Sequence, residues 1–210
     1  MTTSPPPGER IFQRLDACKA YPYTAKEYAL RLCWKVVQGT VFRFSPTRAY
    51  GWRRFLLRCF GATMQANTGV RPTTRIFHPW LLTVEERSIL GDGVVVYNLG
   101  PVRIGRHTVI SQDVYLCAGT HDYTRADLPL LRTGISIGGG VWIAAQAFIC
   151  PGVKIGDNAV IGARAVVTGD LPAGMVAAGN PARVIKARTM IDDAGAPAPL
   201  LSTSAPGGST

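Results

Sequence analysis

The residues of this chain that are best suited to chemistry lie at an interruption in a regular count. His121 follows Gly119 and Thr120 at the point where a six-residue spacing of aliphatic side chains stops, and residues 122–134 leave the repeat. Histidine has an unperturbed pKa near neutral pH, so it often acts as a general acid or base. Because an excursion adds nothing to the packing of a repeat, the break makes His121 a candidate for chemistry. A surface histidine at the mouth of a loop is the alternative.

The spacing on both sides of the interruption predicts the scaffold. Aliphatic residues recur every six positions, at Ile104, Ile110 and Leu116 and then at Ile137, Ile143, Ile149, Ile155, Ile161 and Val167. A fixed short period of this kind is typical of a β-solenoid built from hexapeptides, whose interior is filled by stacked side chains. Residues 70–103 carry irregular versions of the repeat. We therefore predict a mainly β domain over residues 70–189.

The first 69 residues are predicted to form a basic helical extension. Residues 24–43 have apolar side chains at helical spacing, in a stripe that includes Tyr28, Leu32 and Val36. A second helix is expected to begin at an N-cap Ser45, with Pro46 in its first position, and to end before Gly61. Residues 1–9 and the tail 190–210 are rich in small residues and proline and are expected to be disordered.

The charge of the chain is unevenly distributed. Residues 1–75 contain 13 Lys and Arg against 3 Asp and Glu, a balance of +10, whereas residues 76–210 contain 10 of each. This excess predicts an anionic partner for the N-terminal third, such as lipid head groups, nucleic acid or an acidic polymer. The chain has no long uncharged apolar run, no secretory signal and no CxxC pair among its five cysteines, so we expect a cytoplasmic protein with free thiols.

Several motifs together resemble a known family. They are Tyr97-Asn98-Leu99, Ser111-Gln112, Gly119-Thr120-His121-Asp122-Tyr123 and the segment from Gly179 to Lys186. These motifs are similar to segments of the hexapeptide-repeat acyltransferases, and most similar to exopolysaccharide acetyltransferases of the colanic-acid type. The resemblance implies a left-handed parallel β-helix of three hexapeptides per coil behind an N-terminal α-helical extension. It also implies a homotrimer with active sites between subunits, acetyl-CoA as the donor and no metal.

The resemblance implies two catalytic residues. His121 would take the proton of a sugar hydroxyl as that hydroxyl attacks the thioester carbonyl, in a direct transfer, and a backbone N–H would stabilise the oxyanion. Asn98 would orient the hydroxyl. An asparagine at the corner of a coil, in a left-handed turn, is the alternative for Asn98.

The resemblance also implies a donor site. Trp142 would form a wall of the pantetheine tunnel, although it could instead be a wedge that closes the coil. Small residues would line the tunnel, and cationic residues would meet the phosphates of the donor. The small residues are Ala145, Ala163 and Thr168, and the cationic residues are Arg183 and Lys186.

We therefore expect an acetyl-CoA-dependent O-acetyltransferase that acts on a sugar hydroxyl, free or in a lipid-linked oligosaccharide, in exopolysaccharide biosynthesis. An acetyltransferase for an amino sugar or another small molecule remains an alternative, as does a solenoid scaffold that binds an anionic surface. A zinc-dependent carbonic anhydrase of the same fold is not favoured, because His78, His107 and His121 lack the close pair that class uses. Nucleic acid is not expected as a partner, because no binding module is recognised.

Two roles are open for the helices in residues 24–61. They could contact the inner face of the membrane peripherally, or they could cover the open end of the solenoid. The membrane contact would use two sets of residues in the second helix. The apolar set is Trp52, Phe55, Leu56 and Phe60, and the basic set is Arg48, Arg53, Arg54 and Arg58.

Overall fold

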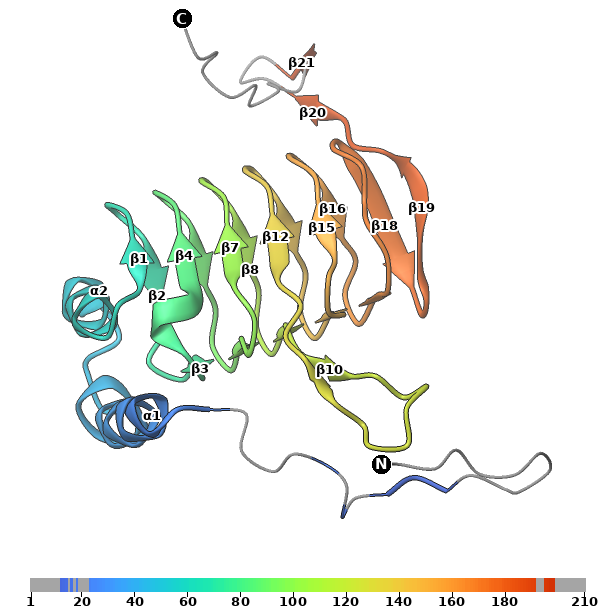
Figure 1. Cartoon of the computed structure of the whole chain (residues 1–210). Coiled ribbons are helices and arrows are strands. Elements are labelled where there is room, and N and C mark those ends of the chain that lie inside the picture. Colours follow the sequence, from blue (N-terminus) through green and yellow to red (C-terminus); the bar gives the residue numbers. More distant parts are fainter. Residues whose placement is uncertain (1–11, 15, 17, 19–22, 192–194, 199–210) are drawn as a thin grey trace, which may run out of the picture.

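The computed structural model describes residues 12–14, 16, 18, 23–191 and 195–198, and its main body is a β-helix with three faces (Figure 1). Face A consists of β1 (Thr63–Met64), β4 (Leu82–Val84), β7 (Val102–Ile104), β12 (Ile135–Ile137) and β15 (Lys154–Ile155). Face B consists of β2 (Gly69–Val70), β5 (Ile89–Leu90), β8 (Val109–Ile110), β13 (Trp142–Ile143), β16 (Val160–Ile161), β18 (Met175–Gly179) and β19 (Ala182–Ala187). Face C consists of β3 (Arg75–Ile76), β6 (Val95–Tyr97), β9 (Tyr115–Cys117), β14 (Phe148–Ile149) and β17 (Val166–Val167). The predicted β-helix is therefore confirmed.

The hexapeptide aliphatics fill the interior of this prism. Strands of successive coils pair in parallel and in register, as Ile110 does with Ile143 and Ile143 with Ile161. All the aliphatic residues that set the six-residue count are buried. Alternate residues of each strand point outward, because successive side chains of a strand lie on opposite sides.

The irregular stretch before Ile104 forms coils with a longer period. Val84 pairs with Ile104 and Leu90 with Ile110, so partners there are 20 residues apart (104 − 84 = 20). Later partners such as Ile137 and Ile155 are 18 apart (155 − 137 = 18). The two extra residues lie where face C turns into face A, a position that we call the C/A corner. The first strand, β1, begins within the stretch that was assigned to the N-terminal extension.

The first helix is α1 (Ala25–Val37), which continues into a short π-helix, η2 (Gln38–Phe42). Thr24 and Glu27 form a reciprocal capping box at its start. The apolar stripe that predicted this helix does not face the coils, because Leu32 is 65% exposed and Val36 is also exposed. The buried residues are Trp34 and Phe42 instead. The Nε1 of Trp34 donates to the carbonyl of Ile76 (2.6 Å), so hydrogen bonding to the first coil decides which side of α1 faces inward.

The second helix, α2 (Tyr50–Cys59), begins later than predicted. Ser45 is not its N-cap, since the helix starts after Ala49. The Oγ of Ser45 instead donates to the carbonyl of Phe42 (2.6 Å) and accepts from Arg53. The predicted end is confirmed, because Gly61 follows the helix with a φ of +87°, a conformation that glycine adopts most readily.

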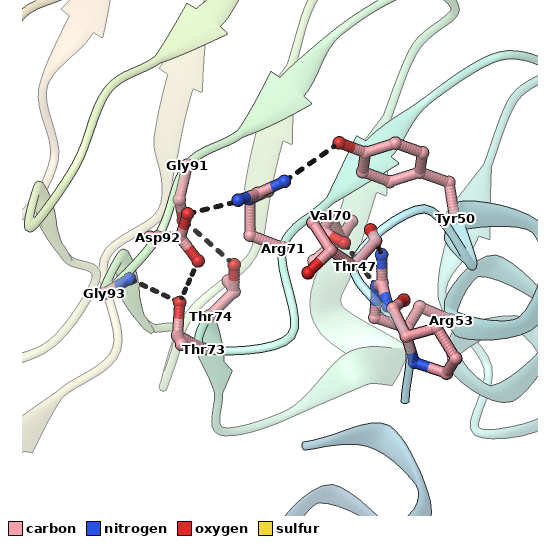
Figure 2. Close-up of polar contacts among 11 residues, drawn as sticks. Thr47, Tyr50, Arg53, Val70, Arg71, Thr73, Thr74, Gly91, Asp92 and Gly93 are labelled. Atoms are coloured by element: carbon pink, nitrogen blue, oxygen red, sulfur yellow. Dashed lines mark hydrogen bonds and ion pairs between the residues drawn. The ribbon is translucent and has the colours of Figure 1, made fainter. Parts of the chain in front are cut away.

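Three arginines of α2 donate hydrogen bonds to carbonyls of the first coil or of the segment before α2 (Figure 2 shows Arg53). Arg53 is fully buried and donates to the carbonyls of Val70 (2.5 Å), Pro46 and Thr47. Arg54 donates to the carbonyl of Thr68 (2.7 Å), and Arg58 donates to that of Met64 (2.9 Å). Arg53 is buried and cannot meet lipid, so the basic set proposed for the membrane contact is wrong for this residue. For Arg54 and Arg58 that contact stays a prediction. All three arginines satisfy carbonyls at the open end of the β-helix, which otherwise have no neighbouring coil to pair with.

The first two coils are also joined by an ion pair on the same side (Figure 2). Arg71 donates to Asp92 (2.7 Å), Thr73 donates to the other oxygen of Asp92 (2.6 Å), and Arg71 lies 3.4 Å from the hydroxyl of Tyr50 in α2. The Thr73 hydrogen bond, followed by that of Arg71, lowers the pKa of the Asp92 carboxyl. These contacts fix α2 against the first two coils. We call α1, η2 and α2 together the helical cap.

The tail and the start of the chain fall largely outside the described residues, including residues 1–9. Within the tail, β20 (Met190–Ile191) pairs with β21 (Pro197–Ala198) in antiparallel fashion. None of the helices in the described part of the chain is long and apolar enough to cross a membrane.

Candidate active site

His121 lies on a hairpin that leaves the prism at the C/A corner. The hairpin consists of β10 (Thr120–His121) and β11 (Leu130–Leu131), and it projects away from the coils (Figure 1). The imidazole is exposed, and its Nδ1 lies 2.7 Å from the carbonyl oxygen of Leu128. A carbonyl can only accept a hydrogen bond, so Nδ1 carries the proton and Nε2 of the neutral ring presents a lone pair. The arrangement suits a general base.

The turn of the hairpin is shaped to hold this carbonyl in place. Leu128 has a φ of +43°, in the left-handed region that a side chain of this kind rarely occupies. Its N–H donates to the carbonyl of Arg125 (3.2 Å), and Arg125 forms an ion pair with Asp127 (2.8 Å). Asp122 accepts from both the hydroxyl and the N–H of Thr124, which lowers the pKa of its carboxyl. Backbone strain at a site that orients a reactive group fits a functional role.

Asn98 lies at the same corner, one coil earlier, and is fully buried. Its Oδ1 accepts from the N–H groups of Phe77 (3.2 Å) and His78 (2.9 Å), and its Nδ2 donates to the carbonyl of His78 (2.6 Å). Its φ is not positive, so the alternative of a left-handed corner asparagine is wrong. The side chain clamps two coils together and keeps one amide hydrogen for any other partner.

Trp142 lies on the outer surface of face B. It is 48% exposed, and its Nε1 donates to the Oγ of Ser111 (3.0 Å). The structure does not place it inside the coil, so it is not an interior wedge. Its register partners on successive strands are Val160, Val176 and Lys186. Lys186 thus lies in the same row as Trp142, about 15 Å away at the usual strand spacing.

The other predicted donor residues occupy two corners and the last strand. Ala145 and Ala163 stack at the corner between faces B and C, where the N–H of Arg164 donates to the carbonyl of Ala145 (2.9 Å). Arg183 is exposed on β19, near Lys186. Thr168 follows β17 at the C/A corner and is separated from these residues.

Within one chain, therefore, the predicted base and most predicted donor residues do not meet. His121 and Thr168 lie at the C/A corner, whereas Ala145 and Ala163 lie at the corner between faces B and C. Face C separates the two corners by roughly 20 Å, the width of a six-residue side. A site that uses both sets needs a second copy of the chain.

The structure adds residues near the C/A corner that the sequence did not identify. The guanidinium of Arg132, where the excursion returns to the prism, lies 4.4 Å from the ring centroid of Tyr23 and 3.9 Å from Glu27. His78, which was given no role, is buried below them, with its Nδ1 bonded to the carbonyl of Asn98 (2.8 Å). The sequence does carry a sign of this corner. The coils before Ile104 repeat every 20 residues instead of 18, and the two additional residues of each coil lie at the C/A corner, near His78 in one coil and Asn98 in the next.

No group of three or more His, Cys, Asp and Glu side chains in the described ranges is arranged to hold a metal ion.

Three-faced hexapeptide coils interrupted by a histidine-bearing hairpin define a hexapeptide-repeat transferase. Residues 134–169 match the family described as bacterial transferase hexapeptide (six repeats). The chain is 47% identical over 155 residues, 74% of this chain and 85% of the other, to WcaF of Escherichia coli (strain K12), which carries the name of a colanic acid biosynthesis acetyltransferase. It is 33% identical over 137 residues to the galactoside O-acetyltransferase of the same organism, covering 64% of this chain and 68% of that one. The chain belongs to the hexapeptide-repeat acetyltransferases and is an acyltransferase.

A solved structure agrees with this assignment. A galactoside acetyltransferase in complex with coenzyme A superposes with a TM-score of 0.73 at 29% identity, covering 85% of this chain and 91% of that one. The likeness extends beyond the coils, since 85% of the chain is more than the coils alone.

Proposed function

We propose that this acetyltransferase transfers an acetyl group from acetyl-CoA to a hydroxyl of a sugar in exopolysaccharide biosynthesis. The observation that carries the proposal is the Nε2 of His121, left as an exposed acceptor by the hydrogen bond from Nδ1 to Leu128. The donor is supported by the coenzyme A complex of the related galactoside acetyltransferase. The acceptor class is supported by the name of WcaF, and its lipid-linked form is part of the proposal.

The reaction would be a direct transfer with His121 as general base. Nε2 takes the proton of the hydroxyl while the hydroxyl oxygen forms a bond to the thioester carbonyl carbon. The carbon–sulfur bond then breaks, and the leaving thiolate accepts the proton that the imidazolium took from the hydroxyl. The carbonyl of Leu128 stabilises the imidazolium, because it accepts from the ring nitrogen that stays protonated. A backbone N–H would meet the oxyanion.

The structure leaves Asn98 fewer free hydrogen-bonding groups for the acceptor hydroxyl than the sequence alone suggested. Its Oδ1 already accepts two backbone hydrogen bonds, so only the remaining amide hydrogen could reach an acceptor hydroxyl. We propose that Asn98 mainly positions the corner from which the hairpin of His121 starts. Its direct contact with the acceptor stays a prediction.

The donor would lie along face B. Trp142 provides an exposed aromatic wall, Ala145 and Ala163 leave room at the adjacent corner, and Lys186 ends the same row with a cation. A linear thiol with phosphates at its far end fits such a row, with Lys186 and Arg183 near the phosphates. Thr168 would contact the donor from another copy of the chain, because it lies at the opposite corner.

We propose that the working assembly is a homotrimer with each site between two copies. The outward residues of face A are polar, whereas those of faces B and C are mainly apolar, with Arg75 on the first strand of face C and Lys186 on the last strand of face B as exceptions. Face A presents Thr83, Arg103, Ser136 and Lys154, face B presents Ile89, Val109, Trp142 and Val160, and face C presents Tyr115, Phe148 and Val166. Apolar surfaces on two different faces favour a ring in which face B of one copy meets face C of the next.

We also propose that the helical cap contacts the inner face of the membrane, through part of the apolar set expected first, because Trp52 and Phe55 are exposed whereas Leu56 is buried. Val41, Phe44, Trp52 and Phe55 form what we call the outer patch, and all four are exposed. The rings of Trp52 and Phe55 stack at 5.7 Å, and Trp52 Nε1 donates to the carbonyl of Val41 (3.1 Å). Residues 24–75 contain ten Lys and Arg and one acidic residue, a balance of +9, which favours anionic lipid.

The test of the function is release of thiol from acetyl-CoA with a panel of acceptors. The panel contains free sugars, lipid-linked oligosaccharides, amino sugars and small alcohols. We expect turnover with a sugar hydroxyl, and His121→Ala should lower kcat by about 10²–10⁴-fold, the usual contribution of a general base. His107→Ala, at an exposed corner, is the matched control and should leave turnover unchanged. Normal turnover in His121→Ala would exclude this base, and turnover with amino sugars only would exclude the acceptor class.

A further inference from the structure

A cavity lies between α1 and β3, outside the residues proposed for the base and the donor row. Its volume is about 460 Å³, which is within the range of small-molecule sites. Tyr28, Leu32 and Phe77 contribute apolar wall, and Arg31, Lys35 and Arg75 contribute charge. The cavity belongs to the first coil, whereas His121 follows the third coil and Lys186 lies beyond the last complete coil. None of the roles proposed for His121, Asn98 or the donor row uses it, and of its lining only β3 belongs to face C, which we propose meets the next copy.

The charge of the cavity is uncompensated among the described residues. Arg31 and Lys35 are one helical turn apart on α1, and Arg75 faces them from β3. None of the three forms an ion pair with a described carboxylate. Glu27, the acidic residue one turn before Arg31, is occupied by Thr24 and Arg132. Like charges one turn apart destabilise a helix, so the arrangement favours an anion between them.

The walls of the cavity are held in place before any ligand arrives. Trp34 donates to the carbonyl of Ile76 (2.6 Å), and the side-chain oxygen of Gln38 accepts from the N–H of Ile76 (2.7 Å), so α1 is fixed against β3. The guanidinium of Arg31 lies 4.2 Å from the ring centroid of Tyr23, which restricts its rotamers. A preorganised site loses less entropy when it binds.

The geometry points to a binding site for a phosphate or diphosphate group carried on an apolar or aromatic group. Guanidinium and ammonium groups bind phosphate oxygens through charge-assisted hydrogen bonds. Tyr28, Leu32 and Phe77 suit a hydrocarbon chain or a planar ring next to the phosphates. This chemistry has two sources, a prenyl diphosphate and a nucleotide, and binding at the site does not depend on acetyl transfer.

The experiment is calorimetric titration of the full chain, at fixed salt, with geranyl diphosphate, ADP, geraniol and inorganic pyrophosphate. We expect geranyl diphosphate or ADP to bind, and the double variant Lys35→Gln with Arg75→Gln to weaken that binding at least tenfold. The tighter of the two ligands identifies the source. Leu32→Asn should weaken geranyl diphosphate more than pyrophosphate. The side chains of Leu32, Lys35 and Arg75 are exposed, so we expect these variants to fold, and circular dichroism would check this.

The matched control is Arg48→Gln with Arg106→Gln, which removes the same charge from exposed positions elsewhere. An equal loss of affinity in the control would show that binding depends only on the net charge of the protein, and would overturn the proposed site. Pyrophosphate binding as tightly as the other ligands would overturn the apolar part of the proposal. No binding by any of the four ligands would overturn the proposal as a whole. The proposal would also fail if the Lys35 and Arg75 variant changed its oligomeric state but kept its affinity for the ligand.

Discussion

Two histidines at the C/A corner show how the environment of a single side chain decides its use. His121 is exposed and has one nitrogen fixed by a backbone carbonyl, so its other nitrogen is available for proton transfer. His78 is 1% exposed, bonds to the carbonyl of Asn98, and has no described partner for Nε2. The same residue type is therefore a candidate base in one place and part of the packing in the other.

The burial of His78 predicts a pH dependence of stability. Burial lowers the pKa of its imidazole, Arg31 and Arg132 lower it further, and the carbonyl of Asn98 and the carboxylate of Glu27 act in the opposite direction. Above the unfolded pKa of about 6.5 the ring is neutral in both states. Below that pH only the unfolded chain takes up the proton, so the free energy of unfolding should fall, by at most about 1.4 kcal/mol per pH unit.

The measurement is urea unfolding of the wild type and of His78→Asn at pH 7.5 and 5.5. The variant should lose less stability than the wild type on going to pH 5.5, because the group that titrates is gone. His107→Asn, at an exposed corner with a φ of +55°, should keep the wild-type dependence. An identical pH dependence in His78→Asn would show that other groups are responsible.

At the scale of the element, α2 shows that the arginines of a basic amphipathic helix can bind carbonyls at the end of a β-helix. Arg53, Arg54 and Arg58 satisfy carbonyls of the first coil, which leaves Trp52 and Phe55 on the outer side. A guanidinium group has five N–H donors, so one buried arginine can satisfy several carbonyls at the open end of a solenoid. The helix therefore covers the coils on one side and exposes apolar rings on the other.

The outer patch predicts binding to anionic membranes that depends on its aromatic rings. The double variant Trp52→Ser with Phe55→Ser should lower co-sedimentation with vesicles that contain anionic lipid, by about tenfold or more, because about 1.5–3 kcal/mol of burial is lost per large side chain. Ile191→Ser, an exposed apolar residue outside the cap, serves as the control. Unchanged vesicle binding in the double variant would show that the cap is not the contact, and binding to neutral vesicles alone would contradict the role of charge.

At the scale of the whole molecule, the prism separates the residues that we propose for one reaction. The C/A corner carries His121, and the corner between faces B and C carries Ala145 and Ala163. A triangular cross-section cannot bring two of its corners together. Assembly is the remaining way to combine them, and the apolar outer surfaces of faces B and C are suited to it.

This separation predicts complementation between two inactive variants. His121→Ala removes the base, and Ala163→Trp should block the donor row at the other corner. If each site takes its base from one copy and its donor row from the next, trimers mixed at equal amounts should recover about a quarter of the wild-type activity, since half the sites have each component. The measurement is thiol release after co-expression, with sedimentation to confirm the trimer. Mixed samples that stay inactive while remaining trimeric would place the whole site within one chain.

The sequence predicted the coils from Ile104 onward because a solenoid repeats one local pattern. Each inward aliphatic residue meets its equivalents in the coils before and after it, so period alone fixes its environment. The same regularity made the break after His121 visible. The earlier coils were missed as regular elements because two extra residues at the C/A corner changed the period from 18 to 20.

Only the tertiary structure decided which sides of the helices are buried and which corners the site residues occupy. The stripe of Leu32 and Val36 is as apolar as a core face, yet hydrogen bonds from Trp34 and Gln38 to Ile76 turn the other side inward. Arg53 reads as a surface charge until the carbonyls that it satisfies are known. Sequence period determines what repeats along an axis. Contacts made once, such as those between a helix and the end of a prism, depend on which groups need a partner in three dimensions.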